Sequence, residues 1–313
     1  MSDLWLWVGF SLLVLSMLAL DLGVFHRKAH EVSFREALVW SVVWIALALA
    51  FNVGVYFWKG SSSAVEFLAA YLIEKSLSVD NIFVFLVIFN YFQVPPAYQH
   101  RILFWGIIGA LAFRALFIVA GIQLLKMFHW MVYVFGVFLL FTGIRMAVRH
   151  GKHLHLEHNP ALRLARRLFR VTPAYEGARF FVRKEGALYA TPLFVTLLFV
   201  ESTDIVFAID SIPAVLAVSR DLFVVYTSNV FAILGLRALY FCLAGFMRLF
   251  AYLHYGLAVV LAFIGMKMVL SDVYKVPVGW SLGFIALALT VSIVFSIAKP
   301  PVEKQPTLEA GKQ

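Results

Sequence analysis

The nine residues IEKSLSVDN, at positions 73–81, place four charged or amide side chains inside a run that is otherwise apolar. The stretch VESTDIVFAIDSIP, at positions 200–213, interrupts a second apolar run in the same way, with three carboxylates. An ionised side chain near the centre of a bilayer costs about 3 kcal/mol on insertion scales, so such residues are rare in membrane helices and usually functional. These two stretches therefore indicate both the class of fold and the place where function resides.

The composition is that of an integral membrane protein. Of the 313 residues 63% are hydrophobic and only 14% are charged, which is too little charge to cover the surface of a soluble protein of this length. The formal net charge is +9, but the basic residues cluster between apolar runs, as topology-determining charges do. We therefore expect a lipid bilayer, and no nucleic acid, as the partner of these charges.

Nine apolar runs are long enough to cross a bilayer as helices. They lie at about 4–25, 36–57, 64–92, 101–125, 128–148, 190–218, 222–247, 252–271 and 278–298. The sequence thus predicts an all-α, polytopic membrane protein with about nine transmembrane helices in a single domain, residues 1–298. The polar, proline-bearing tail at 299–313 is predicted to be disordered.

The loop charges predict the orientation in the membrane. Residues 149–189, hereafter the basic loop, contain nine Lys and Arg against three Glu, whereas the loops that alternate with the basic ones are short and poor in Lys and Arg. Because basic loops stay in the cytoplasm, we expect the basic loop and the carboxyl terminus there and the amino terminus outside. The membrane would be a bacterial-type inner membrane.

An internal repeat is visible. Two pairs of segments match, LAFRALFIVAG (111–121) with LGLRALYFCLAG (234–245) and FTGIRM (141–146) with FIGMKM (263–268). The first pair aligns Arg114 with Arg237. Each copy holds three helices, about 64–148 and 190–271, and an odd number of crossings places the copies in opposite orientations. Inverted repeats of this kind place a substrate site near the midplane, where the halves meet.

Helical spacing groups the polar residues of the two stretches. Glu74, Ser78 and Asn81 are spaced i, i+4, i+7 and share one helical face, and Glu201 shares a face with Asp204 at i, i+3. Carboxylate, amide and hydroxyl oxygens suit hard divalent cations such as magnesium, calcium or manganese. Neither stretch contains Cys or His, which argues against a zinc or copper site.

Asp80 and Asp210 do not fit these faces on straight helices. Pro213 lacks the N–H for a bond to the carbonyl of residue 209, so we expect the sixth helix to break beside Asp210 and turn it inward. The alternative interpretation of all these charges is a structural network in which Lys75 and the two repeat arginines neutralise carboxylates. Asp21 and the histidine-rich tract at 149–158 are weaker candidates for metal binding.

Three segments resemble the signature motifs of the TerC family of membrane proteins, and its Alx branch most of all. They are YLIEKSLSVDNIFVF, ESTDIVFAIDSIPAV and TSNVFAILGLRALYF, and the similarity runs from LALDLGVF near the start to WSLGF in the last apolar run. Alx-type members are named as membrane-bound redox modulators and associated with manganese export. Tellurite resistance, alkaline-pH response and calcium handling have also been attached to the family. The resemblance implies that the transport ligands are Glu74, Asp80, Asn81, Glu201, Asp204 and Asp210.

These observations predict a secondary transporter, not an enzyme, that exports manganese and is driven by protons or the membrane potential. The ion would be cargo, with calcium as the alternative, and no resident cofactor is expected. The redox label finds no support in the residues, because Cys242 is the only cysteine and no flavin or haem motif is present. Two alternatives stay open: a metal-dependent or aspartyl intramembrane enzyme, and a metal- or pH-responsive scaffold. Cation selectivity, the coupling ion and the oligomeric state are left open by the sequence.

Overall fold

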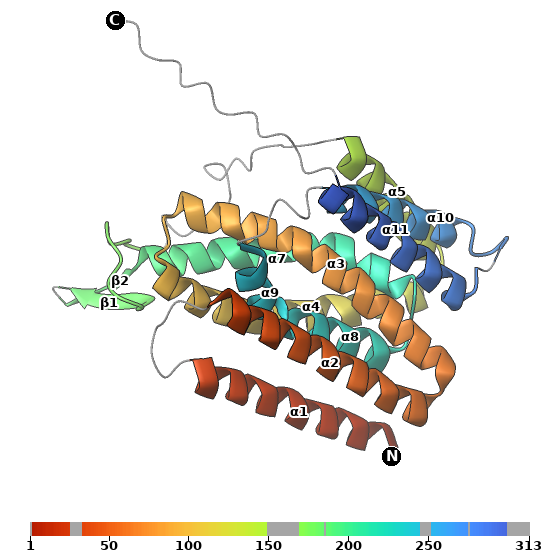
Figure 1. The fold of residues 1–313 in the computed structure, drawn as a ribbon, viewed down its shortest axis with the longest axis horizontal. Helices are drawn as coiled ribbons and strands as arrows, with labels where there is room; N and C mark the ends of the chain where they lie inside the picture. Colours follow the sequence, from red (N-terminus) through yellow and green to blue (C-terminus); the bar gives the residue numbers. More distant parts are fainter. Residues whose placement is uncertain are drawn as a thin grey trace, which may run out of the picture.

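The computed structural model describes residues 2–25, 33–148, 169–184, 186–244, 252–274 and 276–298. Over these residues the chain is a bundle of long helices with one small β-hairpin (Figure 1). The helices are α1 (Ser2–Phe25), α2 (Phe34–Lys59), α3 (Ser61–Tyr91), α4 (Pro96–Met127), α5 (Met131–Val148), α7 (Pro192–Leu216), α8 (Leu222–Leu234), α9 (Leu236–Ala244), α10 (Leu253–Val269) and α11 (Val278–Ala298). Each apolar run identified in the sequence carries helix.

The structure confirms an all-α, polytopic membrane protein. Within the described residues six spans are long and apolar enough to cross a bilayer. They are Phe34–Lys59, Pro96–Met127, Met131–Val148, Pro192–Leu216, Leu222–Leu243 and Val278–Ala298. The Asp21 side chain, the histidine-rich tract and the tail at 299–313 lie outside the part of the chain that the structure describes.

The predicted break at Pro213 is wrong. α7 continues through this residue to Leu216. A proline inside a helix loses its own bond to the residue four positions earlier, but here the helix ends three residues later, so little regular structure remains to be disturbed. The carbonyl of Pro213 still accepts a bond from the N–H of Ala217 at 3.0 Å. The interruption lies elsewhere, at Gly235, where the predicted helix 222–247 divides into α8 and α9.

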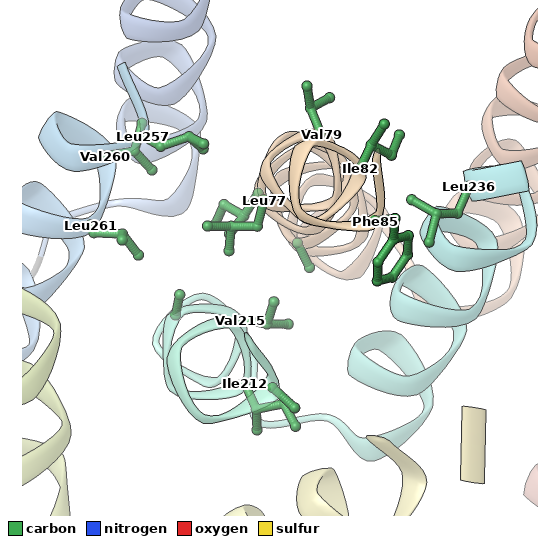
Figure 2. Packing of buried hydrophobic residues seen from close by; sticks show 14 of the residues in the cluster. Leu77, Val79, Ile82, Phe85, Ile212, Val215, Leu236, Leu257, Val260 and Leu261 are labelled. Atoms are coloured by element: carbon green, nitrogen blue, oxygen red, sulfur yellow. The ribbon is translucent and has the colours of Figure 1, made fainter. Parts of the chain in front are cut away.

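α3 lies at the centre of the packing, in contact with α2, α7, α8 and α11, while α7 packs on α4 and α5 on α10. Figure 2 shows Leu77 of α3 pointing toward α7 and α10, and Phe85 meeting Leu236 of α9 on the other side. Lipid tails are as apolar as these side chains, so close packing rather than escape from water holds such helices together. The bundle thereby places α7 in contact with both α3 and α4.

α5 and α10 approach each other until their backbones touch. A Cβ on Gly143 would lie 2.7 Å from the carbonyl oxygen of Ala258, and one on Gly265 would lie 2.6 Å from the carbonyl oxygen of Gly136. Such contacts need glycine at these positions, and small residues at crossings are the usual way in which membrane helices come close. The crossing therefore depends on these glycines.

A hairpin that the sequence did not predict lies at the end of the basic loop. Its strands β1 (Phe181–Lys184) and β2 (Ala187–Ala190) are antiparallel, with Val182 opposite Tyr189. The preceding segment is tied to the bundle by the Tyr175 hydroxyl, which donates to the carbonyl oxygen of Phe92 at 2.7 Å. Part of the basic loop is thus ordered against the ends of the helices.

Candidate functional site

The guanidinium of Arg114, on α4, joins carboxylates from two other helices. It pairs with Glu74 of α3, and with Asp204 of α7 through Nη2–Oδ1 at 3.1 Å and Nε–Oδ2 at 3.4 Å. Nη1 also donates to Ser211 Oγ at 3.2 Å. We call these four residues the arginine junction. Glu74 is fully buried and Arg114 is 1% exposed, so these charges are removed from solvent and lipid alike.

The sequence places all three charged members near the middle of long helices, far from the ends where a charged side chain could reach water. A planar guanidinium has five donors in a fixed fork and can serve two carboxylates at once, which an ammonium group cannot do with the same geometry. With one positive and two negative groups, the ionised junction keeps an excess of one negative charge. It is therefore an electrostatically favourable place for a cation.

Two carboxylate oxygens in this region accept no hydrogen bond from any described residue. They are Glu74 Oε2 and Glu201 Oε2, and both are buried. An unsatisfied buried acceptor costs about 1–3 kcal/mol, so native structures rarely keep one without a ligand or a function. These oxygens are available to coordinate a hard cation.

Glu201 lies one turn before Asp204 on α7 and packs against α4 at Gly109. A Cβ on Gly109 would occupy the position of the Glu201 carboxylate. The predicted common face of Glu201 and Asp204 is consistent with this placement, since both side chains are directed toward α4. Gly109 was missed in the sequence, although a glycine inside a membrane helix is itself a signal of close approach.

The remaining predicted ligands divide between two places. Ser78 and Asn81 are buried on α3 with Glu74, as their spacing predicts. Asp210 lies elsewhere: it is half-buried and accepts a bond from Thr142 Oγ1 of α5 at 3.4 Å. The break that was predicted to turn it inward is absent, because α7 stays helical, and six further residues place Asp210 about 120° around the helix from Asp204. The side chain of Asp80 lies outside the described residues.

The two other basic residues considered with the acidic stretches have different surroundings. Lys75 donates to the carbonyl oxygen of Ala232 at 3.3 Å, beside the interruption at Gly235, and is not in an ion pair with any carboxylate that the structure describes. Arg237 is buried on α9 and, with Asp204, lines a small cavity of about 10 Å³. The carboxylate network of Arg114 is of the kind expected from the structural interpretation.

Among the described side chains, no three His, Cys, Asp or Glu residues come together as a group that could hold a metal ion. The guanidinium of Arg114 stands between Glu74 and Asp204. The structure thus brings Glu74 and Asp204 together through Arg114 and leaves Asp210 apart. The six-residue ligand set stays a prediction.

The chain matches the family model described as "Integral membrane protein TerC family" over residues 59–304. It is 53% identical to "Uncharacterized membrane protein STKORF319" of Myxococcus xanthus over 294 residues, 94% of this chain and 92% of that protein. It is also 47% identical to "Putative membrane-bound redox modulator Alx" of Salmonella typhi, with 93% of both chains covered. A relative of the same name from Escherichia coli K12 is 46% identical, over 93% of this chain and 94% of that one. No solved structure matches the chain.

Proposed function

Because the chain belongs to the TerC family of integral membrane proteins, we propose that it is a secondary transporter that exports manganese ions from the cytoplasm across a bacterial inner membrane. Protons or the membrane potential drive the transport. The observation that carries this proposal is the arginine junction, where buried carboxylates of α3 and α7 meet at a guanidinium in the middle of the bundle. A carboxylate with free lone pairs is the ligand that Mn²⁺ and similar hard cations prefer.

In this mechanism Arg114 pairs with both carboxylates of the junction when no cargo is bound. An ion that arrives between Glu74 and Asp204 replaces part of the guanidinium contact and gains the oxygen of Glu74 that accepts no bond from described residues. On release, the guanidinium returns to both carboxylates. Glu74 and Asp204 are therefore never left together without a positive partner. A buried carboxylate without such a partner would cost several kcal/mol.

The transport model uses nine membrane crossings and an inverted repeat. The first copy is α3–α4–α5 and the second is α7, α8 with α9, and α10. In a twofold relation α3 corresponds to α7, α4 to α8 with α9, and α5 to α10. The packing supports it, because the contact of α3 with α8 matches that of α7 with α4. The corresponding helices α3 and α7 also contact each other, as do α5 and α10. A site at the interface of inverted copies can be opened to either side by rocking one copy against the other. With the amino terminus outside, the basic loop and the carboxyl terminus are cytoplasmic.

The other functions considered make different demands on the residues. An aspartyl enzyme needs two carboxylates that share one proton, whereas Arg114 separates Glu74 from Asp204 here. The Alx relatives are named for redox modulation, but Cys242 is the only cysteine of this chain, so a dithiol couple within it is ruled out. If the protein were a scaffold, its phenotype would require the basic loop and would depend less on single carboxylates.

The test is Mn²⁺ flux into inverted membrane vesicles. We expect wild-type vesicles to accumulate Mn²⁺ under a proton gradient and Asp204→Asn vesicles to accumulate none, because the substitution keeps the size of the side chain and removes its charge. Glu176→Gln is the matched control: its carboxylate pairs with Lys184 at 2.5 Å in the partly exposed hairpin region. Equal flux in wild type and Asp204→Asn would refute the proposal.

A further inference from the structure

The hairpin of β1 and β2 is fixed at the place where two membrane spans begin. The N–H of Thr191, the residue before α7, donates to the carbonyl oxygen of Phe180 at 2.9 Å, and its hydroxyl donates to the carbonyl oxygen of Arg179 at 2.6 Å. Arg101, in the second turn of α4, holds its guanidinium over the ring of Phe180 at 5.1 Å. Because α4 and α7 are both long and apolar enough to cross a bilayer, the hairpin, which Figure 1 shows beyond the amino end of α7, lies at the height of the lipid head groups.

One face of the hairpin is exposed and combines apolar with basic side chains. Side chains alternate along a strand, so Phe181 and Arg183 of β1 share a face with Leu188 of β2, which lies directly opposite Arg183. We call these three residues the hairpin face. Leu188 is 63% exposed and Phe181 is 38% exposed. The ring of Phe181 lies 4.4 Å from that of Phe194, in the first turn of α7, so the hairpin face continues onto the surface of a membrane span.

The charge of this region calls for an anionic partner. Arg179 and Arg183 are exposed, and neither forms an ion pair with a carboxylate that the structure describes. Lys184 differs, because it pairs with Glu176. The basic loop as a whole holds nine Lys and Arg against three Glu. A guanidinium binds a phosphate through two parallel hydrogen bonds, and the exposed leucine beside it suits the boundary between head groups and acyl chains.

We propose that the hairpin face binds the head groups of anionic phospholipids, with Leu188 inserted at the membrane boundary and the guanidinium groups of Arg179 and Arg183 on the phosphates. Basic segments beside a membrane span bind anionic lipids in this way, at about 1 kcal/mol for each Lys or Arg. The proposal does not depend on the identity of a transported ion. Since β2 leads directly into α7, bound lipid would fix the depth at which α7, and with it Asp204, lies in the bilayer.

The experiment places a fluorophore at Leu188 of the full chain and measures its quenching by nitroxide-labelled lipids. Cys242, the only cysteine, is first replaced by Cys242→Ser, and Leu188→Cys then carries the label in lipid nanodiscs of phosphatidylcholine with increasing phosphatidylglycerol. We expect quenching to rise with the fraction of phosphatidylglycerol. Ala187→Cys is the matched control, because the neighbouring side chain points to the opposite face of the hairpin and its label should be quenched much less.

Charge is tested with and without a substitution. Adding Arg183→Gln should raise the fraction of phosphatidylglycerol needed for half of the quenching about fivefold, the loss expected for one basic residue at an anionic surface, and Arg183→Lys should restore most of it. Salt at 1 M shortens the Debye length to about 3 Å, so it should reduce the quenching in anionic nanodiscs to the value in neutral ones.

Three results would overturn the proposal. Equal quenching in neutral and anionic nanodiscs, unchanged by salt, would show that the hairpin face does not recognise anionic head groups. Equal quenching of the labels at positions 188 and 187 would show that the hairpin does not present this face to the membrane. No quenching at position 188 in any lipid would show that the face is turned to the solvent, where only a soluble partner could cover it.

Discussion

Replacing Arg114 with Met tests whether the guanidinium and the transported cation compete for the same carboxylates. Methionine keeps an unbranched side chain of similar length and removes the charge and every donor. In the variant, Glu74 and Asp204 are left buried with no counter-charge between them. We expect the ion-free protein to lose stability and Mn²⁺ to restore it.

The magnitude follows from the burial of the junction. Removal of one partner from a buried ion pair costs about 3–5 kcal/mol, because the other charge stays buried and uncompensated. Mn²⁺ in the vacated place restores the balance, and at 100 times its dissociation constant a ligand stabilises the folded state by about 2.7 kcal/mol. In wild type the ion must first displace Arg114, so the same Mn²⁺ concentration stabilises less.

The assay is unfolding of the purified protein in detergent with and without Mn²⁺, followed by the fluorescence of its eight tryptophans. Lys59→Met is the control, because Lys59 pairs with Asp221 at a partly exposed helix end, where loss of a pair costs about 0–1 kcal/mol. Adding Glu74→Gln and Asp204→Asn to Arg114→Met should recover stability and abolish the response to Mn²⁺. If Mn²⁺ stabilises wild type and Arg114→Met equally, guanidinium and cation do not compete and the reasoning is wrong.

Three further predictions concern the ligand set, the orientation in the membrane and the contact between α4 and α7. Asp80→Asn and Asp204→Asn should each abolish protection of exporter-deficient cells against Mn²⁺. The double variant should protect little worse than either single variant, because residues that act on one ion are non-additive. If each variant instead lost about half of the protection and the losses added independently, the two acidic stretches would be separate features. Reporter fusions within the basic loop and after residue 298 should report the cytoplasm, and a fusion at the amino terminus should report the outside; an external signal from the basic loop would contradict the orientation. Gly109→Ala should displace the Glu201 carboxylate, at a cost of about 1–3 kcal/mol in stability and with loss of flux. The control is Gly279→Ala, where a Cβ meets no atom within 4 Å, and it should leave stability and flux unchanged.

The charged members of the arginine junction could be identified from the sequence because a charge in hydrocarbon is costly and therefore conspicuous. Glu74 and Asp204 stand in apolar runs, and Arg114 stands at the matching position of a repeated segment. Helical spacing also predicted which side chains share a face, since it depends only on the geometry of one helix. Their pairing could not be predicted, because a helical face does not reveal which neighbouring helix lies opposite.

The errors have local causes. The proline rule applies to the interior of a helix, and Pro213 lies too close to the end of α7 for it to break the helix. The interruption at Gly235 left no signal, because glycine is common inside continuous membrane helices. The hairpin that begins at Phe181 was hidden by its setting, where the many basic residues indicated a loop and the alternation within four residues was too short to indicate a strand.

The glycine contact between α5 and α10 has a consequence for synthesis of the protein. About 100 residues separate Val148, at the end of α5, from Leu253, at the start of α10, and at 5–20 residues per second a ribosome needs roughly 5–20 s to make them. During that interval α5 is in the membrane while the surface it will bury, with Gly136 and Gly143, has no partner. Lipid or the insertion machinery must cover this groove until α10 emerges, so the growing chain is most exposed to misassembly and proteolysis at this stage.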